Sequence, residues 1–119
     1  MEEADGETTI TLATDILFTP DSSKLPTSAS NKIESLLSKI PKGAEVKVNG
    51  HTDSVHGAKD NKKLSSDRAE AVAAVLKKAR SDLKTTVKGL ADTQPAVRED
   101  PKDLSTYAAN RRVEIIYAG

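Results

Sequence analysis

The sequence predicts an α/β sandwich in which two long helices cover one face of a four-stranded mixed sheet. Strand-like and helix-like segments alternate along the chain in the order β-α-β-α-β-(short α)-β. Such alternation is typical of folds in which helices pack against a sheet. Because two long helices cannot cover both faces, we expect the second face of the sheet to stay partly solvated.

In the first half of the chain, the pattern of apolar residues predicts strand, helix and strand over residues 8–18, 27–40 and 44–50. Apolar residues alternate in the strands and recur every three to four residues in the helix, which are the periods of these two structures. A Pro-Lys-Gly stop follows the helix. In the second strand Val46 and Val48 share one face, so both are expected to be buried.

The second half of the chain is predicted to hold a long helix, two strands and a helical turn, joined by polar loops. In chain order these are a loop at 51–63, a helix at 64–80, a strand at 83–90, a loop at 92–105, a turn at 107–109 and a strand at 112–117. The length suits one domain with a single modest core, so residues 1–119 are predicted to be one domain. Residues 1–7 are expected to form a disordered lead-in.

The composition argues against several classes of function. Lys plus Arg and Asp plus Glu number 18 each, so the formal net charge is zero. A neutral chain has no bulk field that steers it to nucleic acid or to an anionic membrane, and we expect neither partner. The chain has no cysteine, which excludes disulfides, zinc fingers and thiol nucleophiles. No apolar run approaches the roughly 18 residues that span a bilayer.

Arg68 is an inward-facing cation in the long predicted helix. It precedes Val72 and Leu76 by four and eight residues, so it lies on the same face as the buried stripe. It also lies in the first turns of the helix, where the macrodipole disfavours a cation. Arg68 therefore needs an anionic partner. A salt bridge to Asp53 or Asp67 would be a purely structural explanation.

Asp53 ends a Gly-His-Thr-Asp motif at the point where a predicted strand leaves the sheet. Ligands of α/β sheets gather at such carboxyl ends of strands. Asp53 and Arg68 bracket one loop, so their side chains could converge. A carboxylate beside a guanidinium suits a zwitterionic ligand, with Asp53 taking an ammonium and Arg68 a carboxylate. Taken alone, Asp53 could also be an ordinary loop carboxylate or helix cap.

A metal-dependent hydrolase is the enzymatic alternative. His51, Asp53 and His56 could form a two-histidine, one-carboxylate metal site. The sequence offers no partner that would orient these ligands, and His56 lies in a glycine-containing loop. Ser65 and Ser66 lack the surroundings of a nucleophile elbow and are explained as helix-capping residues. We therefore predict no metal, no cofactor and no catalysis.

Three motifs occur in order along the chain, Gly-His-Thr-Asp-Ser at 50–54, Asn-Lys-Lys-Leu-Ser-Ser-Asp-Arg-Ala at 61–69 and Asn-Arg-Arg-Val-Glu-Ile at 110–115. Together they resemble the OmpA-like peptidoglycan-binding domain, and the resemblance runs from about residue 12 to the C-terminus. It implies non-catalytic binding of the diaminopimelate end of an uncrosslinked peptide stem. It also implies a place in the cell envelope, in the periplasm or at the cell wall, as part of a larger exported or membrane-anchored protein.

The same resemblance implies the ligand-binding residues. The acidic ligand residue of the family falls on Asp53, its arginine on Arg68 and its asparagine on Asn61. Thr52, from the first motif, is expected to contact the same ligand. Thr19 stands where relatives often carry Asp or Asn, so it brings a hydrogen bond without a charge.

The Asn-Arg-Arg sequence at 110–112 is expected to be mainly structural, because Arg112 begins the last predicted strand. A related envelope domain that docks another protein without binding the wall is the leading alternative function. The presence of Asp53, Asn61 and Arg68 argues against that alternative.

Overall fold

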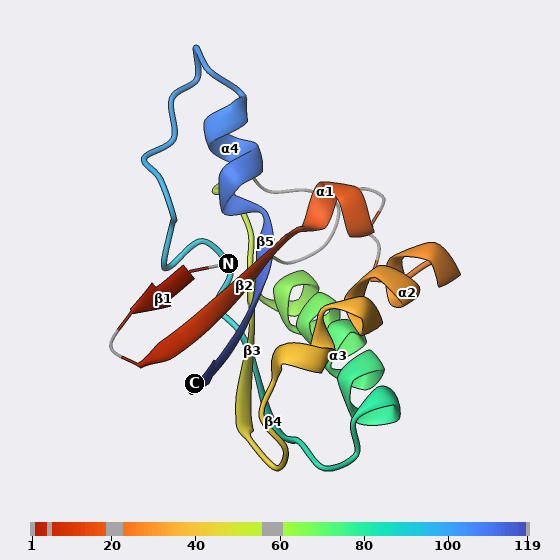
Figure 1. Ribbon diagram of the computed structural model, residues 1–119. Helices are drawn as coiled ribbons and strands as arrows, with labels where there is room; N and C mark the ends of the chain where they lie inside the picture. Colours follow the sequence, from red (N-terminus) through yellow and green to blue (C-terminus); the bar gives the residue numbers. More distant parts are fainter. Residues whose placement is uncertain (1, 5, 19–22, 56–60, 119) are drawn as a thin grey trace.

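A computed structural model describes residues 2–4, 6–18, 23–55 and 61–118 and shows a five-stranded mixed sheet (Figure 1). In spatial order its strands are β1 (Glu2–Ala4), β2 (Glu7–Ala13), β5 (Arg112–Ala118), β3 (Glu45–His51) and β4 (Lys84–Gly89). β3 and β4 are parallel, and the other neighbours are antiparallel. The predicted four-stranded mixed sheet is thus confirmed, and β1 adds a short strand at one edge.

The start of the chain differs from the disordered lead-in predicted for residues 1–7. Glu2–Ala4 pair with the first three residues of β2, so that Ala4 lies opposite Glu7. Gly6 has φ +79°, a left-handed conformation that glycine adopts without strain and that suits a tight hairpin. The pattern missed β1 because three residues are too few to show a period.

Two helices pack on one face of the sheet, as predicted (Figure 1). α2 (Thr27–Ser35) is followed by a short 3-10 helix, η1 (Leu37–Lys39), so the predicted helix at 27–40 is divided in two. α3 (Asn61–Ala79) begins three residues before the prediction. The core between helices and sheet is apolar, and its fully buried members include Ile33, Val46, Val48, Val72, Leu76, Val113 and Ile115. Among the described residues, no helix is long and apolar enough to cross a membrane.

A helical turn, α1 (Thr14–Leu17), replaces the end of the strand that was predicted over residues 8–18. The backbone N–H of Thr14 donates to the carbonyl of Arg111 at 3.0 Å, and that of Phe18 donates to the carbonyl of Thr14 at 2.8 Å. Leu17 and Phe18 are both buried, at 3% and 5% exposure. Consecutive strand residues point to opposite faces, so a turn is needed to bury two neighbours in one core.

The second face of the sheet is partly solvated, as expected at Glu45 and Lys47, but its upper end is covered. The segment between β4 and β5 lies there and leads into α4 (Ser105–Asn110), which confirms and lengthens the predicted turn. Arg112 points to this face and donates from Nη2 to the carbonyl of Gln94 at 3.0 Å. Arg112 is therefore buried rather than solvated.

Two glycines allow the first half of α3 to lie directly on the sheet. A Cβ at Gly50 would be 2.0 Å from the carbonyl oxygen of Ser65, and one at Gly89 would be 2.5 Å from the backbone nitrogen of Ser66. Backbone therefore packs against backbone at the ends of β3 and β4. This close approach fixes the first two turns of α3 beside the carboxyl ends of the strands.

Candidate functional site

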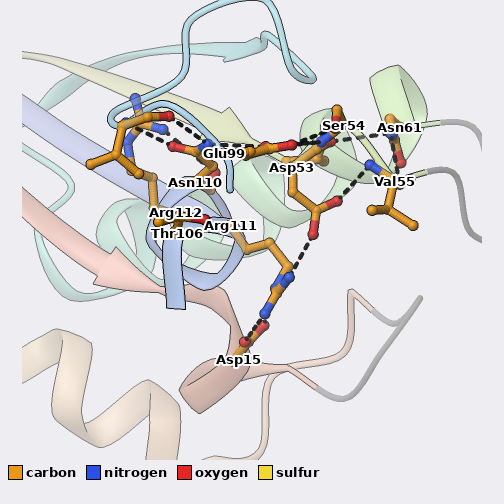
Figure 2. A network of polar contacts seen from close by, with 12 residues as sticks. Asp15, Asp53, Ser54, Val55, Asn61, Glu99, Thr106, Asn110, Arg111 and Arg112 are labelled. Carbon is orange, nitrogen blue, oxygen red and sulfur yellow. Dashed lines mark hydrogen bonds and ion pairs between the residues drawn. The ribbon is translucent and has the colours of Figure 1, made fainter. Parts of the chain in front are cut away.

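Asp53 follows β3, at the carboxyl end of the strand, as the sequence predicts. Its carboxylate is 10% exposed and accepts a hydrogen bond through each oxygen (Figure 2). Oδ2 accepts from Arg111 Nη1 at 2.5 Å, and Oδ1 accepts from the backbone N–H of Val55 at 3.0 Å. The N–H of Thr52 donates to the carbonyl of Ala91 at 2.9 Å, which continues the strand pairing up to the site.

Arg111 joins two carboxylates that lie far apart in the sequence. Besides Asp53 it binds Asp15 of α1 in a bidentate pair, with Nε to Oδ1 and Nη2 to Oδ2 both at 2.8 Å (Figure 2). The hydrogen bonds to Asp15, with a further one to Asp53, raise the pKa of the Arg111 guanidinium above its usual value. Arg111 thus ties the loop after β3 to α1.

The structural role predicted for Arg111 agrees with these contacts, but the sequence did not predict its partners Asp53 and Asp15. The contact between Arg111 and Asp53 follows from the register of the sheet, because His51 pairs with Arg112 in antiparallel strands. The residue before Arg112 must then lie beside the residues that follow His51, which are Thr52 and Asp53. Neither strand reveals that register by its own pattern.

Asn61 and Thr52 are both buried and both hold the backbone of the loop after β3. Asn61, the first residue of α3, donates from Nδ2 to the carbonyls of Asp53 at 3.4 Å and Val55 at 3.2 Å. The hydroxyl of Thr52 donates to the carbonyl of Asp53 at 2.9 Å. These two residues therefore fix the direction in which the Asp53 side chain leaves the strand.

Arg68 lies on the inner face of α3, and its side chain is buried although it carries a charge. The residue is 6% exposed, and its Cζ lies 5.2 Å from the centroid of the Phe18 ring. A guanidinium over an aromatic face gains a cation–π interaction.

Asp53 and Arg68 come from different elements, and each is connected to the segment of α1 and Phe18, Arg68 directly and Asp53 through Arg111. Asp53 reaches α1 through Arg111 and Asp15, whereas Arg68 packs on Phe18, the residue after α1. Asp53 is thus linked to the first turn of α1 by way of Arg111, and Arg68 contacts the residue directly after α1. Thr19, the remaining predicted contact residue, lies outside the described residues.

Glu99 connects the loop after β3 to the segment before α4. Its carboxylate accepts from the backbone N–H of Ser54 at 3.1 Å, from the Ser54 hydroxyl, and from Asn110 Nδ2 at 3.0 Å (Figure 2). The hydrogen bonds from Ser54, with the one from Asn110, lower the pKa of Glu99. Asn110 also accepts from the backbone N–H groups of Ala96 and Val97, so it has the structural role that its motif predicts.

The arrangement of the described residues does not support the metal-site alternative. His51 points to the face of the sheet opposite α3, where Nε2 lies 3.0 Å from Glu114 Oε1. In residues 2–4, 6–18, 23–55 and 61–118, no group of three or more His, Asp or Glu side chains could hold a metal ion. His56 lies outside this part of the chain.

The fold and the site together are those of a small domain with one buried carboxylate, at the carboxyl end of β3, and one buried guanidinium, on the inner face of α3. The family model of the OmpA family matches residues 17–111. The chain belongs to this family, whose domains are non-catalytic peptidoglycan-binding modules. The resemblance noted in the three motifs is therefore confirmed.

Solved structures agree with this assignment. The cell wall anchor of the T6SS from Pseudomonas aeruginosa is similar over 99% of this chain and 85% of its own, with 29% identity and a TM-score of 0.86. The periplasmic domain of MotB from Helicobacter pylori is similar over 98% and 79%, with 25% identity and a TM-score of 0.79. No curated protein sequence matches the chain.

Replacing Arg111 by glutamine is expected to destabilise the fold by about 1–2 kcal/mol, since it removes charged hydrogen bonds to two carboxylates in a half-buried setting. Asp15→Asn should have a smaller effect, because Arg111 keeps Asp53. Urea unfolding followed by circular dichroism measures both. The matched control is Arg98→Gln, at an exposed arginine, which should leave the unfolding midpoint unchanged. An equal loss of stability in Arg98→Gln would show that Arg111 stabilises the fold only through its positive charge and not through its hydrogen bonds to Asp53 and Asp15.

Acidification should reduce stability through Glu114. The hydrogen bond from His51, assisted by Arg112, lowers the pKa of Glu114 below its ordinary value of 4.5. A group with a depressed folded-state pKa stabilises the fold above its unfolded pKa, and this stabilisation is lost as the pH falls through the folded value. Unfolding free energies measured between pH 3 and 7 should therefore decline less steeply below about pH 4.5 in Glu114→Gln. Glu45→Gln, on the exposed part of the same face, should retain the wild-type slope.

Proposed function

We propose that this domain holds cell-wall peptidoglycan through the diaminopimelate end of an uncrosslinked stem peptide and so anchors a larger envelope protein to the wall. Membership of the OmpA family supports peptidoglycan as the ligand. The similar structures include a cell wall anchor and a periplasmic domain, which supports a place in the cell envelope. The motif residues Asp53, Asn61 and Arg68 support the stem peptide as the part that is recognised.

The observation that carries the proposal is a buried carboxylate, Asp53, linked to α1 through Arg111 and Asp15, together with a buried guanidinium, Arg68, packed on Phe18 directly after α1. Asp53 Oδ2 accepts from Arg111 and Oδ1 accepts from the backbone N–H of Val55, and a carboxylate has about four acceptor positions in all. The Asp53 carboxylate can therefore also receive an ammonium group. The Arg68 guanidinium has the planar fork that matches a carboxylate. The free end of diaminopimelate carries both of these charged groups on one carbon.

The other predicted contact residues have lesser roles in this proposal. Asn61 and Thr52 hold the loop that presents Asp53. Thr19 has a hydroxyl and no charge, so this proposal assigns no ionic contact to it. The grip on the ligand therefore depends on Asp53 and Arg68, and no chemical step on the ligand is required.

Co-sedimentation with purified sacculi tests this proposal. We expect the wild-type domain to sediment with the sacculi and to release no muropeptides, and Asp53→Asn to stay in solution. Asp67→Asn is the matched control, since Asp67 belongs to the motif at 61–69, which also contains Asn61 and Arg68, but pairs with Lys63 on the surface of α3. A wild-type domain that stays in solution would favour a protein-docking module without wall binding.

A further inference from the structure

The residue that holds the Asp53 carboxylate has the same charge as the group that Asp53 is proposed to bind. Arg111 Nη1 donates to Asp53 Oδ2 at 2.5 Å (Figure 2). An ammonium group that donates to either oxygen of Asp53 would therefore lie within about 8 Å of the guanidinium. At that separation, in a partly buried setting, the repulsion between two positive charges reduces affinity by more than about tenfold. A site of this kind requires a group that compensates the charge of Arg111.

Asp15 of α1 is placed to compensate that charge. It accepts hydrogen bonds from Nε and Nη2 of Arg111, both at 2.8 Å, whereas Asp53 accepts one from Nη1. A bidentate pair is the stronger kind of contact between an arginine and a carboxylate. In agreement, the pKa of Arg111 is raised chiefly by its hydrogen bonds to Asp15 and less by the one to Asp53. Arg111 is thus paired more completely with Asp15 than with Asp53.

The charges of these three side chains leave one negative charge in excess. Asp53 and Asp15 carry one negative charge each, and Arg111 carries one positive charge. The Asp53 side chain is 10% exposed and that of Asp15 is 50% exposed, so Asp53 is the less screened of the two carboxylates. An ammonium group at Asp53 therefore meets a negative cluster. Without the charge of Asp15, Asp53 and Arg111 would form a neutral pair.

The neighbouring carboxylate of Glu99 does not replace Asp15. The charge of Arg111 is the smallest of the causes that shift the pKa of Glu99, after the hydrogen bonds from Ser54 and Asn110. Among the described residues, the ion pairs of Arg111 are those with Asp15 and Asp53. Compensation of the Arg111 charge by direct contact is therefore left to Asp15.

We propose that Asp15 determines the preference of the site for an ammonium group, because it compensates the charge of Arg111. Asp15 acts through Arg111 and does not itself contact the ligand. This inference rests on the proposed function, since it concerns the ammonium group that Asp53 would bind. It assigns a role in ligand choice to a residue that lies outside the three sequence motifs.

Calorimetry with the diaminopimelate stem peptide tests the proposal on single substitutions of Asp15. Asp15→Asn removes the charge but keeps an oxygen that can accept from Arg111, and we expect about tenfold weaker binding. Asp15→Glu keeps the charge and should bind within about threefold of the wild type. An Asp15→Asn protein that binds as tightly as the wild type would overturn the proposal, and so would an equal loss in Asp15→Glu.

A second substitution separates charge compensation from a merely structural role. In the Asp15→Asn protein, Arg111→Gln removes the uncompensated positive charge, while Asp53 keeps its own charge and its hydrogen bond from Val55. We expect this second change to raise the affinity about tenfold, although it reduces stability further. If Asp15 only held Arg111 in place, the double variant would bind no better than Asp15→Asn. That result would overturn the proposal.

Asp82→Asn is the matched control. Asp82 accepts from Nε and Nη2 of Arg80 at 3.0 and 2.9 Å, which is a bidentate pair of the same kind. This pair contacts Gly43, which precedes β3, whereas Asp53 follows that strand. Asp82→Asn should therefore lower stability and leave peptide affinity unchanged. A tenfold loss of affinity in this control would show that Asp15→Asn acts through stability alone and would overturn the proposal.

The wild-type protein in the same titrations separates this inference from the proposed function. If the wild type does not bind the peptide, the proposed function is wrong and the role of Asp15 falls with it. If the wild type binds and Asp15→Asn binds equally well, the proposed function stands and only the role of Asp15 is overturned.

Discussion

Asp53→Ala and Arg68→Ala are each expected to abolish detectable wall binding, and the two effects should not add. Removal of one partner of a buried charged contact costs about 2–5 kcal/mol, which is roughly 30- to 5,000-fold in affinity. Because the ligand is held at one end by few contacts, either substitution should lower the affinity so far that co-sedimentation no longer detects binding. The second substitution then removes a contact to a ligand that is no longer held.

Stability must be measured on the same variants, because Arg68 also packs on Phe18. Loss of that cation–π contact should lower the free energy of unfolding by about 0.5–2 kcal/mol. Arg80→Ala is the control, because Arg80 directly follows α3, the helix that carries Arg68, and has a structural role. Arg80 donates to the carbonyls of Leu37 and Ile40, so its loss should reduce stability and leave ligand affinity intact. A well-folded Arg68→Ala protein that still binds the wall would contradict the assignment of Arg68.

Gly50→Ala is expected to destabilise the domain strongly, although it adds only one methyl group. The added Cβ would lie 2.0 Å from the carbonyl oxygen of Ser65, and helix backbone cannot move aside as a flexible side chain can. We expect a loss of more than about 3 kcal/mol, beyond the usual range for overpacking. Chemical denaturation monitored by circular dichroism measures it. Displacement of α3 would also weaken wall binding, because Arg68 is carried by that helix.

Two other glycines calibrate this expectation. Gly89→Ala should act like Gly50→Ala, since its Cβ would lie 2.5 Å from the backbone nitrogen of Ser66. Gly43→Ala has open space around the new methyl group but φ +71°, so only backbone strain of about 1–2 kcal/mol is expected. A Gly50→Ala protein no less stable than Gly43→Ala would show that α3 does not pack this closely on β3.

Most of the fold follows from periodicity, and the exceptions have physical causes. The alternation around Val46 and Val48 and the apolar stripe through Val72 and Leu76 predict a strand and a helix that the structure confirms. α1 was missed because a four-residue turn has no period of its own. Only the need to bury both Leu17 and Phe18 reveals it, and that need arises in the tertiary structure.

The candidate site divides in the same way. The inward position of Arg68 and the place of Asp53 at a strand end follow from local spacing. The links of Arg111 to Asp53 and Asp15 join residues 58 and 96 positions apart, so they depend on the register of β5 in the sheet. The contact of Glu99 with Ser54 depends likewise on how the segment before α4 folds back over the sheet. No sequence pattern in one element carries that information.

Isothermal titration calorimetry with two stem peptides tests the central claim most directly. One peptide has diaminopimelate at the diamino acid position of the stem, and the other has lysine at the same position. Both offer an ammonium group to Asp53, but only diaminopimelate adds the carboxylate that Arg68 would bind. The account predicts binding of the diaminopimelate peptide and affinity for the lysine peptide that is lower by at least about 30-fold. Equal affinity for the two peptides would contradict it.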